Sequence, residues 1–207
     1  MSPSGRRRRR APQQERSRAM VERIIAAGRT VLLDNGYEGA STNRIARAAG
    51  ISPGSLYQYF PDKDAIVAEV VDRWTDAMHV RISHVFADAL EGPPTPVSVR
   101  DTMGELLDAL AENPRLLRVL IEELPRSPDS RLAAFERRID DLLTMWLRFH
   151  LRGRGTRPVE AIAWILVRTV ENVAVSYVLD RPPVDRDVVA DELTAMVTAY
   201  LRDMSLP

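Results

Sequence analysis

Three helix-start signals follow one another closely between residues 41 and 62, and their spacing constrains the fold more than any other feature of the chain. Ser41, Ser52 and Asp62 are of the residue types that cap helix N-termini with a side-chain oxygen. Pro53 directly follows Ser52, at the first helical position, where its missing N–H costs no hydrogen bond. Gly50 suits a tight turn between the first two starts. These signals predict a helix over 42–49, a turn, a short helix from residue 53 and a long helix from residue 63.

The stretch GISPGSLYQYF, residues 50–60, has the composition of a poor helix, yet its glycines and proline fall at the turn and in the first turn of the predicted helix. Leu56 and Phe60 are four residues apart and can pack inward against Ile45 and Ala49. The remaining residues of that turn, Tyr57, Gln58 and Tyr59, are left facing largely outward. The pattern predicts a short helix-turn-helix with an aromatic and amide outer face.

Helical periodicity continues through the rest of the chain, and no stretch of useful length alternates like a strand. Apolar residues recur at helical spacing over 16–35, 98–111, 114–124, 129–151, 158–179 and 186–204. Asn35-Gly36 supplies a left-handed stop for the first of these helices. The predicted fold class is all-α, with about nine helices. We expect a disordered arginine-rich tail over 1–14, a three-helix helix-turn-helix domain over 15–62 and a larger helical domain over 63–207.

Charge is distributed unevenly along the 207 residues, although 29 basic and 29 acidic residues cancel. Residues 1–64 hold twelve basic and six acidic residues, so the remainder carries an excess of six acidic ones. A basic N-terminal end on an acidic body indicates an anionic partner at that end. The run Arg6 to Arg10 supplies most of this excess. It is either a solvated tail or an arm that adds attraction to phosphate or the minor groove.

Several classes of protein are disfavoured by composition. The chain has no cysteine, which removes disulfides and thiolate sites and favours a cytoplasmic location. No run of about 18 apolar residues occurs, so we expect no membrane span. Basic residues near the N-terminus are not followed by an apolar stretch, which argues against a secretory signal.

The residues of the first quarter resemble the N-terminal domain of TetR-type transcriptional regulators. The resemblance covers about residues 16–66 without gaps and includes the spacing of all three short helices. It is carried by Ile24-Ile25-Ala26-Ala27, Gly36-Tyr37, Ser41-Thr42, Ile45-Ala46, Ala49-Gly50-Ile51-Ser52, Gly54-Ser55-Leu56-Tyr57, Tyr59-Phe60 and Lys63. The remainder resembles the family in being helical and in ending with two long helices.

The resemblance implies a homodimer whose third helices enter the major groove of double-stranded operator DNA, with two half-sites about one helical turn apart. Ser41 and Thr42 would then meet phosphate. At the start of the second helix, Asn43 and Arg44 would face the duplex. Small residues would let the third helix approach base edges; these are Pro53, Gly54 and Ser55.

The same resemblance assigns roles to the outer face of the third helix. Tyr57 and Tyr59 would bond phosphate through their hydroxyls, and Tyr57 could also touch bases or instead mainly pack. Gln58 is the best direct reader, because a bidentate amide suits adenine. Lys63 would neutralise a phosphate and help to anchor the long fourth helix, although a solvated lysine at a helix start would look the same.

For the larger domain, the resemblance implies a small-molecule effector site and dimerisation through helices of about 158–179 and 186–204. Both helices have more apolar face than one small core needs, which indicates a partner helix; the alternative is that both simply close the core of the monomer. Candidate pocket residues are aromatic, sulfur-containing or polar within apolar helices: Trp74, Met78, Phe86, Met103, Trp146, Phe149, Trp164, Glu171, Asn172 and Tyr177. Glu171 and Asn172 need partners. A ligand, a dimer contact or Arg168 would each provide such a partner.

The predicted function is a ligand-responsive transcriptional regulator, by family default a repressor released by its effector, with no cofactor or metal. An activator of the same fold is one alternative, and a non-specific architectural DNA protein driven by the arginine tail is another. An enzyme is disfavoured, because no cysteine or phosphate-cradling glycine loop occurs. The histidines His79 and His84 are also five residues apart, off the usual metal-binding spacing.

Overall fold

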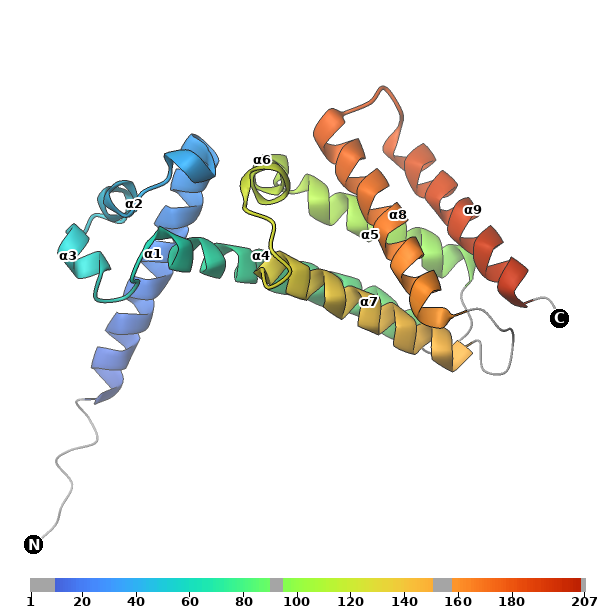
Figure 1. Ribbon diagram of the computed structural model, residues 1–207, viewed down its shortest axis with the longest axis horizontal. Helices are drawn as coiled ribbons and strands as arrows, with labels where there is room; N and C mark the ends of the chain where they lie inside the picture. The colour runs from blue at the N-terminus through green and yellow to red at the C-terminus, as the bar shows by residue number, and fades with distance from the viewer. Residues whose placement is uncertain (1–9, 90–94, 151–157, 206–207) are drawn as a thin grey trace, which may run out of the picture. The chain divides into compact units, whose positions relative to one another are not determined.

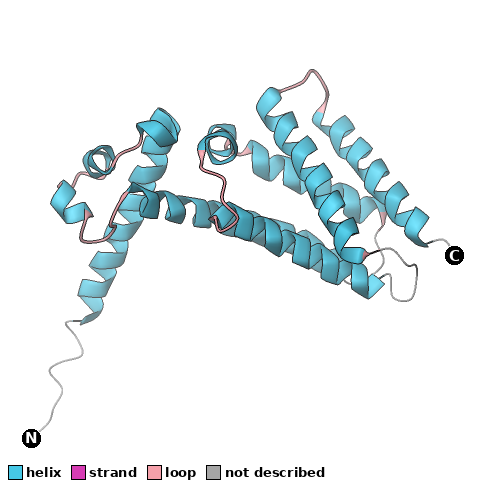
Figure 2. Ribbon diagram, viewed as in Figure 1, coloured by secondary structure: helices cyan, strands magenta, loops and turns pink. Residues whose placement is uncertain are grey.

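Nine α-helices and one π-helix make up the part of the chain that the structure, a computed structural model, describes (Figure 1). That part is residues 10–89, 95–150 and 158–205; for residues 10–13, 84–89 and 203–205 the backbone alone is described. These ranges contain no strand (Figure 2), so the predicted all-α class is confirmed. The elements are α1 (Arg10–Gly39), α2 (Thr42–Ala48), α3 (Pro53–Leu56), α4 (Lys63–Ala89), α5 (Pro96–Ala111), α6 (Pro114–Arg118), the π-helix η1 (Val119–Glu123), α7 (Arg131–His150), α8 (Val159–Asp180) and α9 (Arg186–Ser205).

The chain forms two compact units. The first unit contains the described residues up to Arg73 together with Val119–Leu124, and the second contains Trp74–Arg118 and the described residues from Pro125 onward. Helix α4 is continuous, with its residues up to Arg73 in the first unit. This division differs from the expected boundary between residues 62 and 63, because the start of α4 and the whole of η1 group with the helix-turn-helix.

The core of the first unit gathers apolar side chains from α1 to α4. Fully buried residues include Ile24, Leu32, Ile45, Leu56 and Ile66. Phe60 and Ala49 are also buried, as their spacing predicted. Gly28 lets α4 come close to α1, since an added Cβ would lie 2.6 Å from a methyl carbon of Ile66.

Helix α1 is interrupted where the sequence predicted its end, although it continues to Gly39, and it begins earlier than predicted. Gly36 has φ 68° and ψ −179°, which interrupts the helix after Asn35; this is not the αL conformation that the sequence predicted but another positive-φ region that almost only glycine adopts. The helix starts at Arg10, so residues 10–14 of the predicted disordered tail are helical. Arginine, alanine and glutamine are good helix formers, and Pro12 lies in the first turn, where its missing N–H costs no intrahelical hydrogen bond. Residues 1–9 lie outside the described residues.

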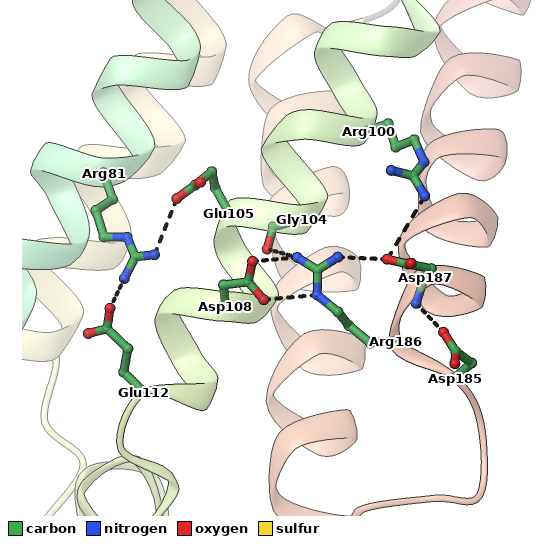
Figure 3. Close-up of polar contacts among 9 residues, drawn as sticks. All are labelled: Arg81, Arg100, Gly104, Glu105, Asp108, Glu112, Asp185, Arg186 and Asp187. Carbon is green, nitrogen blue, oxygen red and sulfur yellow. Dashed lines mark hydrogen bonds and ion pairs between the residues drawn. The ribbon is translucent and has the colours of Figure 1, made fainter.

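Helix α5 packs against α6, α8 and α9 in the second unit, and α7 packs against α8. An arginine clamp joins α5 to α9 (Figure 3). The Arg186 guanidinium donates to Asp108 Oδ1 at 2.8 Å and to the Gly104 carbonyl at 2.9 Å. Arg100 donates to Asp191 at 2.5 Å. These residues stand up to 91 positions apart in the sequence, so the clamp depends on the tertiary fold.

A third arginine in the same view, Arg81, joins α4 to α5 (Figure 3). Arg81 donates to Glu105 at 3.2 Å and is also paired with Glu112. The arginine side chain is 30% exposed. Helices α4, α5 and α9 are therefore connected by charged side chains around a core that includes Met103, Leu107 and Leu110.

Helix α8 is long and apolar enough to cross a membrane by length and composition alone. About a third of its most apolar window is buried within the protein, which a core helix also shows. Its buried residues Ile162, Leu166, Val170, Ala174 and Val178 recur at four-residue intervals, as a helix packed along one side requires. Packing against α5, α6 and α7 accounts for much of the apolar composition.

Candidate nucleic-acid interface and effector site

Short-range capping bonds fix α2 and α3. The Ser41 hydroxyl oxygen accepts from the Arg44 N–H at 3.3 Å, and the Ser52 hydroxyl oxygen accepts from the Ser55 N–H at 3.1 Å. Gly50 has φ 65° and forms the tight turn between the two helices. Both caps and the turn lie at the positions that the sequence predicted. The helix-turn-helix therefore owes its shape largely to interactions among near neighbours in the chain.

An exposed polar face follows directly from this geometry. Tyr57 is 52% exposed, and its hydroxyl lies 3.0 Å from the hydroxyl of Thr42 at the start of α2. Gln58 is exposed beside it. Among the other residues predicted to contact DNA, three are exposed (Asn43, Pro53 and Gly54) and three are half-buried (Ser41, Ser55 and Tyr59). The start of α2 and the residue after α3 thus bring two hydroxyls together, and the neighbouring Gln58 is exposed to solvent.

The two basic residues predicted to face DNA bond to the protein itself. Arg44 is exposed, and its Nη1 donates to the Gly39 carbonyl at 2.7 Å. Lys63 is half-buried, and its ammonium donates to the Tyr37 carbonyl at 3.1 Å while lying 4.1 Å from the centre of the Tyr37 ring. This contact supports the predicted anchoring of α4 by Lys63. Phosphate contacts by either residue remain predictions.

Tyr37 connects the end of α1 to η1 and to α4 by hydrogen bonds, which the sequence did not predict. Its N–H donates to the Glu123 carboxylate of η1 at 2.8 Å, and its hydroxyl donates to Asp64 of α4 at 3.0 Å. Burial raises the pKa of the Tyr37 hydroxyl, and the hydrogen bond to Asp64 raises it further. The Glu123 carboxylate also fills the space beside Gly36, where an added Cβ would lie 2.4 Å from Oε2. Gly36-Tyr37 was visible as a motif, but nothing in the sequence pointed to Glu123.

Comparisons with known proteins agree with this geometry. The family described as "Bacterial regulatory proteins, tetR family" matches residues 24–70, and "Tetracyclin repressor-like, C-terminal domain" matches residues 94–201, more than half of the chain. The chain belongs to the TetR family. It is a DNA-binding transcriptional regulator, as the resemblance implied, and the members of this family are regulators rather than enzymes.

Solved structures share the fold of most of this TetR-family chain. A TetR-family transcriptional regulator of Mesorhizobium loti superposes with a TM-score of 0.69 at 21% identity, covering 92% of this chain and 99% of that one. NalD of Pseudomonas aeruginosa, the secondary repressor of the MexAB-OprM multidrug efflux pump, gives 0.68 at 21%, covering 88% and 96%. FadR of Bacillus subtilis in complex with stearoyl-CoA gives 0.63 at 20%, covering 85% and 96%.

Sequence relatives match over shorter stretches. The nucleoid occlusion factor SlmA of Haemophilus ducreyi is 26% identical over 106 residues, which is 51% of this chain and 50% of SlmA. The regulator UidR of Escherichia coli is 37% identical over 49 residues, 24% of this chain and 25% of UidR. The TetR-family chain thus spans about half the length of the first of these relatives and a quarter of the second.

The predicted effector residues are dispersed over the second unit. Met78, Met103 and Trp146 are buried. Trp74 meets Phe135 edge to face, with ring centroids 6.2 Å apart, and the Tyr177 hydroxyl donates to the Val184 carbonyl at 3.2 Å. The side chain of Phe86 lies outside the described residues. Phe149 and Trp164 are exposed and share a hollow between α7 and α8.

The polar pair within α8 has protein partners. Arg168 forms an ion pair with Glu171 one turn away, and it donates to Asp140 of α7 at 3.1 Å and lies 3.4 Å from Glu136. Burial raises the pKa of Glu171, and the charge of Arg168 opposes that rise. The Asn172 amide donates to the Arg168 carbonyl of its own helix at 2.8 Å. Arg168, one of the partners predicted for Glu171, is therefore the partner found.

The hollow between α7 and α8 is open to solvent and has a volume of about 610 Å³. Its walls come from two helices of the second unit: Asp140, Asp141, Thr144, Met145, Arg148 and Phe149 of α7, with Glu160 and Trp164 of α8. Among the described residues, no group of histidine, aspartate and glutamate side chains is arranged to hold a metal ion.

Proposed function

We propose that this TetR-family regulator is a cytoplasmic repressor that binds a palindromic operator as a homodimer and is released by a small-molecule effector. The observation that carries the proposal is the exposed face formed by Gln58 and the Thr42–Tyr57 hydroxyl pair. The hydroxyls suit phosphate oxygens, which set the position of a protein on the duplex. The amide of Gln58 suits the edge of adenine in the major groove.

The outer faces of α8 and α9 support dimerisation. Apolar side chains on α8 stay exposed at Ile165 and Val173, and those on α9 at Val188 and Met196. Thr169 lies one turn after Ile165, and its hydroxyl donates a hydrogen bond to the Ile165 carbonyl at 2.7 Å. A second copy packed on α8 and α9 would bury this apolar surface, and the Thr169 hydroxyl would keep its hydrogen-bond partner.

Two chain segments support coupling between effector and DNA. Helix α4 continues from the first unit into the second. Helix α6 packs on α8 in the second unit and runs on at Val119 into η1, which packs on α1 in the first. An effector that shifts α6 would act on the Glu123–Tyr37 bond. Effector and operator would then weaken each other's binding by the same coupling free energy, typically about 1–3 kcal/mol.

Selection of binding sites from a random DNA library with the full chain tests the repressor proposal. We expect enrichment of inverted repeats whose half-sites are about ten base pairs apart, centre to centre. Enrichment of single half-sites, or of no sequence at all, would contradict a palindrome-reading dimer.

Two substitutions separate reading from positioning on the selected operator. Gln58→Ala should remove preference at one base position, by about 1–3 kcal/mol of discrimination. Tyr57→Phe keeps the ring and removes the hydroxyl that meets Thr42, so it should weaken binding to all sequences alike. Unchanged preference in Gln58→Ala would exclude Gln58 from the readout.

The architectural alternative is tested by removing residues 1–9, which leaves α1 complete. A sequence-reading dimer should keep its operator preference and lose part of its salt dependence. Loss of most affinity for operator and random DNA alike would favour the architectural protein. An activator would instead bind the operator and raise transcription from it.

A further inference from the structure

The hollow between α7 and α8 exposes large apolar side chains that a core would normally bury. Met145 is 60% exposed, Phe149 54% and Trp164 56%. They come from two helices that pack on each other, and all three line the same hollow of about 610 Å³. An exposed apolar cluster of this kind, bordered by polar residues, marks a site where another molecule binds.

The charged side chains that line the hollow favour one class of ligand. Asp140, Asp141 and Glu160 contribute three carboxylates, and Arg148 contributes one guanidinium. Arg148 is paired with Glu160 across the two helices, which leaves the carboxylate of Asp141 and that of Asp140, the latter paired with Arg168. The surplus disfavours an anionic ligand and favours a cationic one.

Asp140 sharpens this selection. Its Oδ2 accepts from Arg168 at 3.1 Å, while its Oδ1 is buried without a hydrogen-bond partner among the described residues. A buried carboxylate oxygen that lacks a partner is costly. Arg168 also forms ion pairs with Glu136 and Glu171, so its single positive charge does not fully neutralise Asp140.

We propose that the hollow binds a lipophilic organic cation, with the charged centre beside Asp140 and Asp141 and the apolar groups against Phe149 and Trp164. Carboxylates attract the charge, and the faces of aromatic rings add cation–π attraction. Met145 is flexible and adapts to apolar groups of different shape. The inference rests on the proposed function in one respect: it makes this cation the class of the effector.

Two probe ions of nearly the same shape and opposite charge test the proposal. The full-length protein is titrated calorimetrically with tetraphenylphosphonium and, separately, with tetraphenylborate. We expect saturable binding of one tetraphenylphosphonium per chain and no binding of tetraphenylborate over the same range. Equal binding of both ions, or of neither, would overturn the proposal.

Substitutions locate the bound cation. Asp141→Asn should weaken tetraphenylphosphonium binding about five-fold, and Trp164→Leu about five- to ten-fold. The matched control is Asp101→Asn, at an exposed position of α5 outside the hollow, and it should leave the affinity unchanged. Tetraphenylphosphonium binding that is insensitive to Asp141 and Trp164 would place the ion elsewhere and refute the site.

A second copy of the chain is the competing occupant of the hollow. The difference in acrylamide quenching between the unaltered protein and Trp164→Leu reports the accessibility of Trp164. A Trp164 that is shielded in the dimer and becomes accessible on dilution would make the hollow a dimer contact and overturn the proposal. Operator binding is measured on the same samples. Failure of cation binding with intact operator binding would refute this inference and leave the DNA-binding proposal standing.

Discussion

The first unit fixes its helix ends through hydrogen bonds between neighbours in sequence, whereas the second unit joins its helices through arginines bonded to distant carboxylates. Ser52 caps α3 through Ser55, and Asp62 caps α4 through the Ala65 N–H at 2.8 Å, each three residues away. Arg186 and its partner Asp108 are 78 residues apart. The helix caps of the first unit can therefore form early, while the arginine bridges of the second unit form only once its helices have packed together.

The difference extends to the surfaces that remain exposed. In the first unit the face that we propose to read DNA is polar, with the exposed Gln58 and with Tyr57 next to a hydroxyl of α2. In the second unit large apolar side chains are exposed on α7, α8 and α9, among them Phe149, Trp164 and Val188. A polar face with fixed geometry suits sequence reading, and apolar faces suit a partner copy or a lipophilic ligand.

The largest effect should come from a core truncation in the first unit. Leu56 is fully buried, so Leu56→Ala should lower the unfolding free energy of that unit by about 3 kcal/mol and abolish operator binding. Denaturant unfolding followed by circular dichroism measures the change. Val97→Ala, at a position 69% exposed, is the control and should change stability by less than about 0.5 kcal/mol. A small effect of Leu56→Ala would contradict its place in the core.

Removal of the arginine clamp should come next. Arg186→Ala deletes the bonds to Asp108 and to the Gly104 carbonyl, and should lower the unfolding free energy by about 1–2 kcal/mol. A double-mutant cycle with Asp108→Asn isolates the pair. The coupling should be clearly greater than zero. Purely additive single effects would mean that the clamp contributes little to joining α5 and α9.

A lost helix cap should have a smaller effect in the first unit. Ser52→Ala removes the acceptor of the Ser55 N–H and should cost about 1 kcal/mol. Ser17→Ala is the matched control, at an exposed position within α1, and should be neutral or slightly stabilising. Equal effects of the two substitutions would refute the cap as a determinant of stability.

The smallest effect should depend on pH. Because burial raises the pKa of Glu171 in the folded protein, its ionised form opposes folding. Both states are protonated below the unfolded pKa of about 4.3, so Glu171→Gln should have no charge effect there. As pH rises through the folded pKa, the substitution should become stabilising by less than about 1 kcal/mol. Unfolding of both proteins between pH 4 and 8 measures this. A stabilisation that shrinks with rising pH would contradict the stated sign.

The contrast between the units also explains how far the sequence could be read. Gly50, Ser41 and Ser52 act on residues within five positions, so their roles followed from local pattern. Glu123 meets Tyr37 across 86 residues, and no local rule connects them. The charge of Lys63 was noted, but its contact with Tyr37 depends on how α4 packs against the end of α1.

Prediction of the effector site was limited by the same cause. Aromatic and methionine side chains at helical spacing have the same pattern whether they fill a core or line a hollow. The structure buries Met78, Met103 and Trp146 and exposes Phe149 and Trp164. The acidic wall of the hollow, from Asp140 to Glu160, arises only when α7 and α8 pack together.

The grouping of η1 with the first unit has a consequence for exchanging parts between regulators. A chimera that fuses residues 1–73 to a foreign ligand-binding part would leave the Tyr37 N–H without its Glu123 acceptor. The space beside Gly36 would also lose the carboxylate that fills it. The compact unit that contains the helix-turn-helix is therefore discontinuous in the sequence. A working transplant requires a second graft, Val119–Leu124, in addition to the N-terminal one.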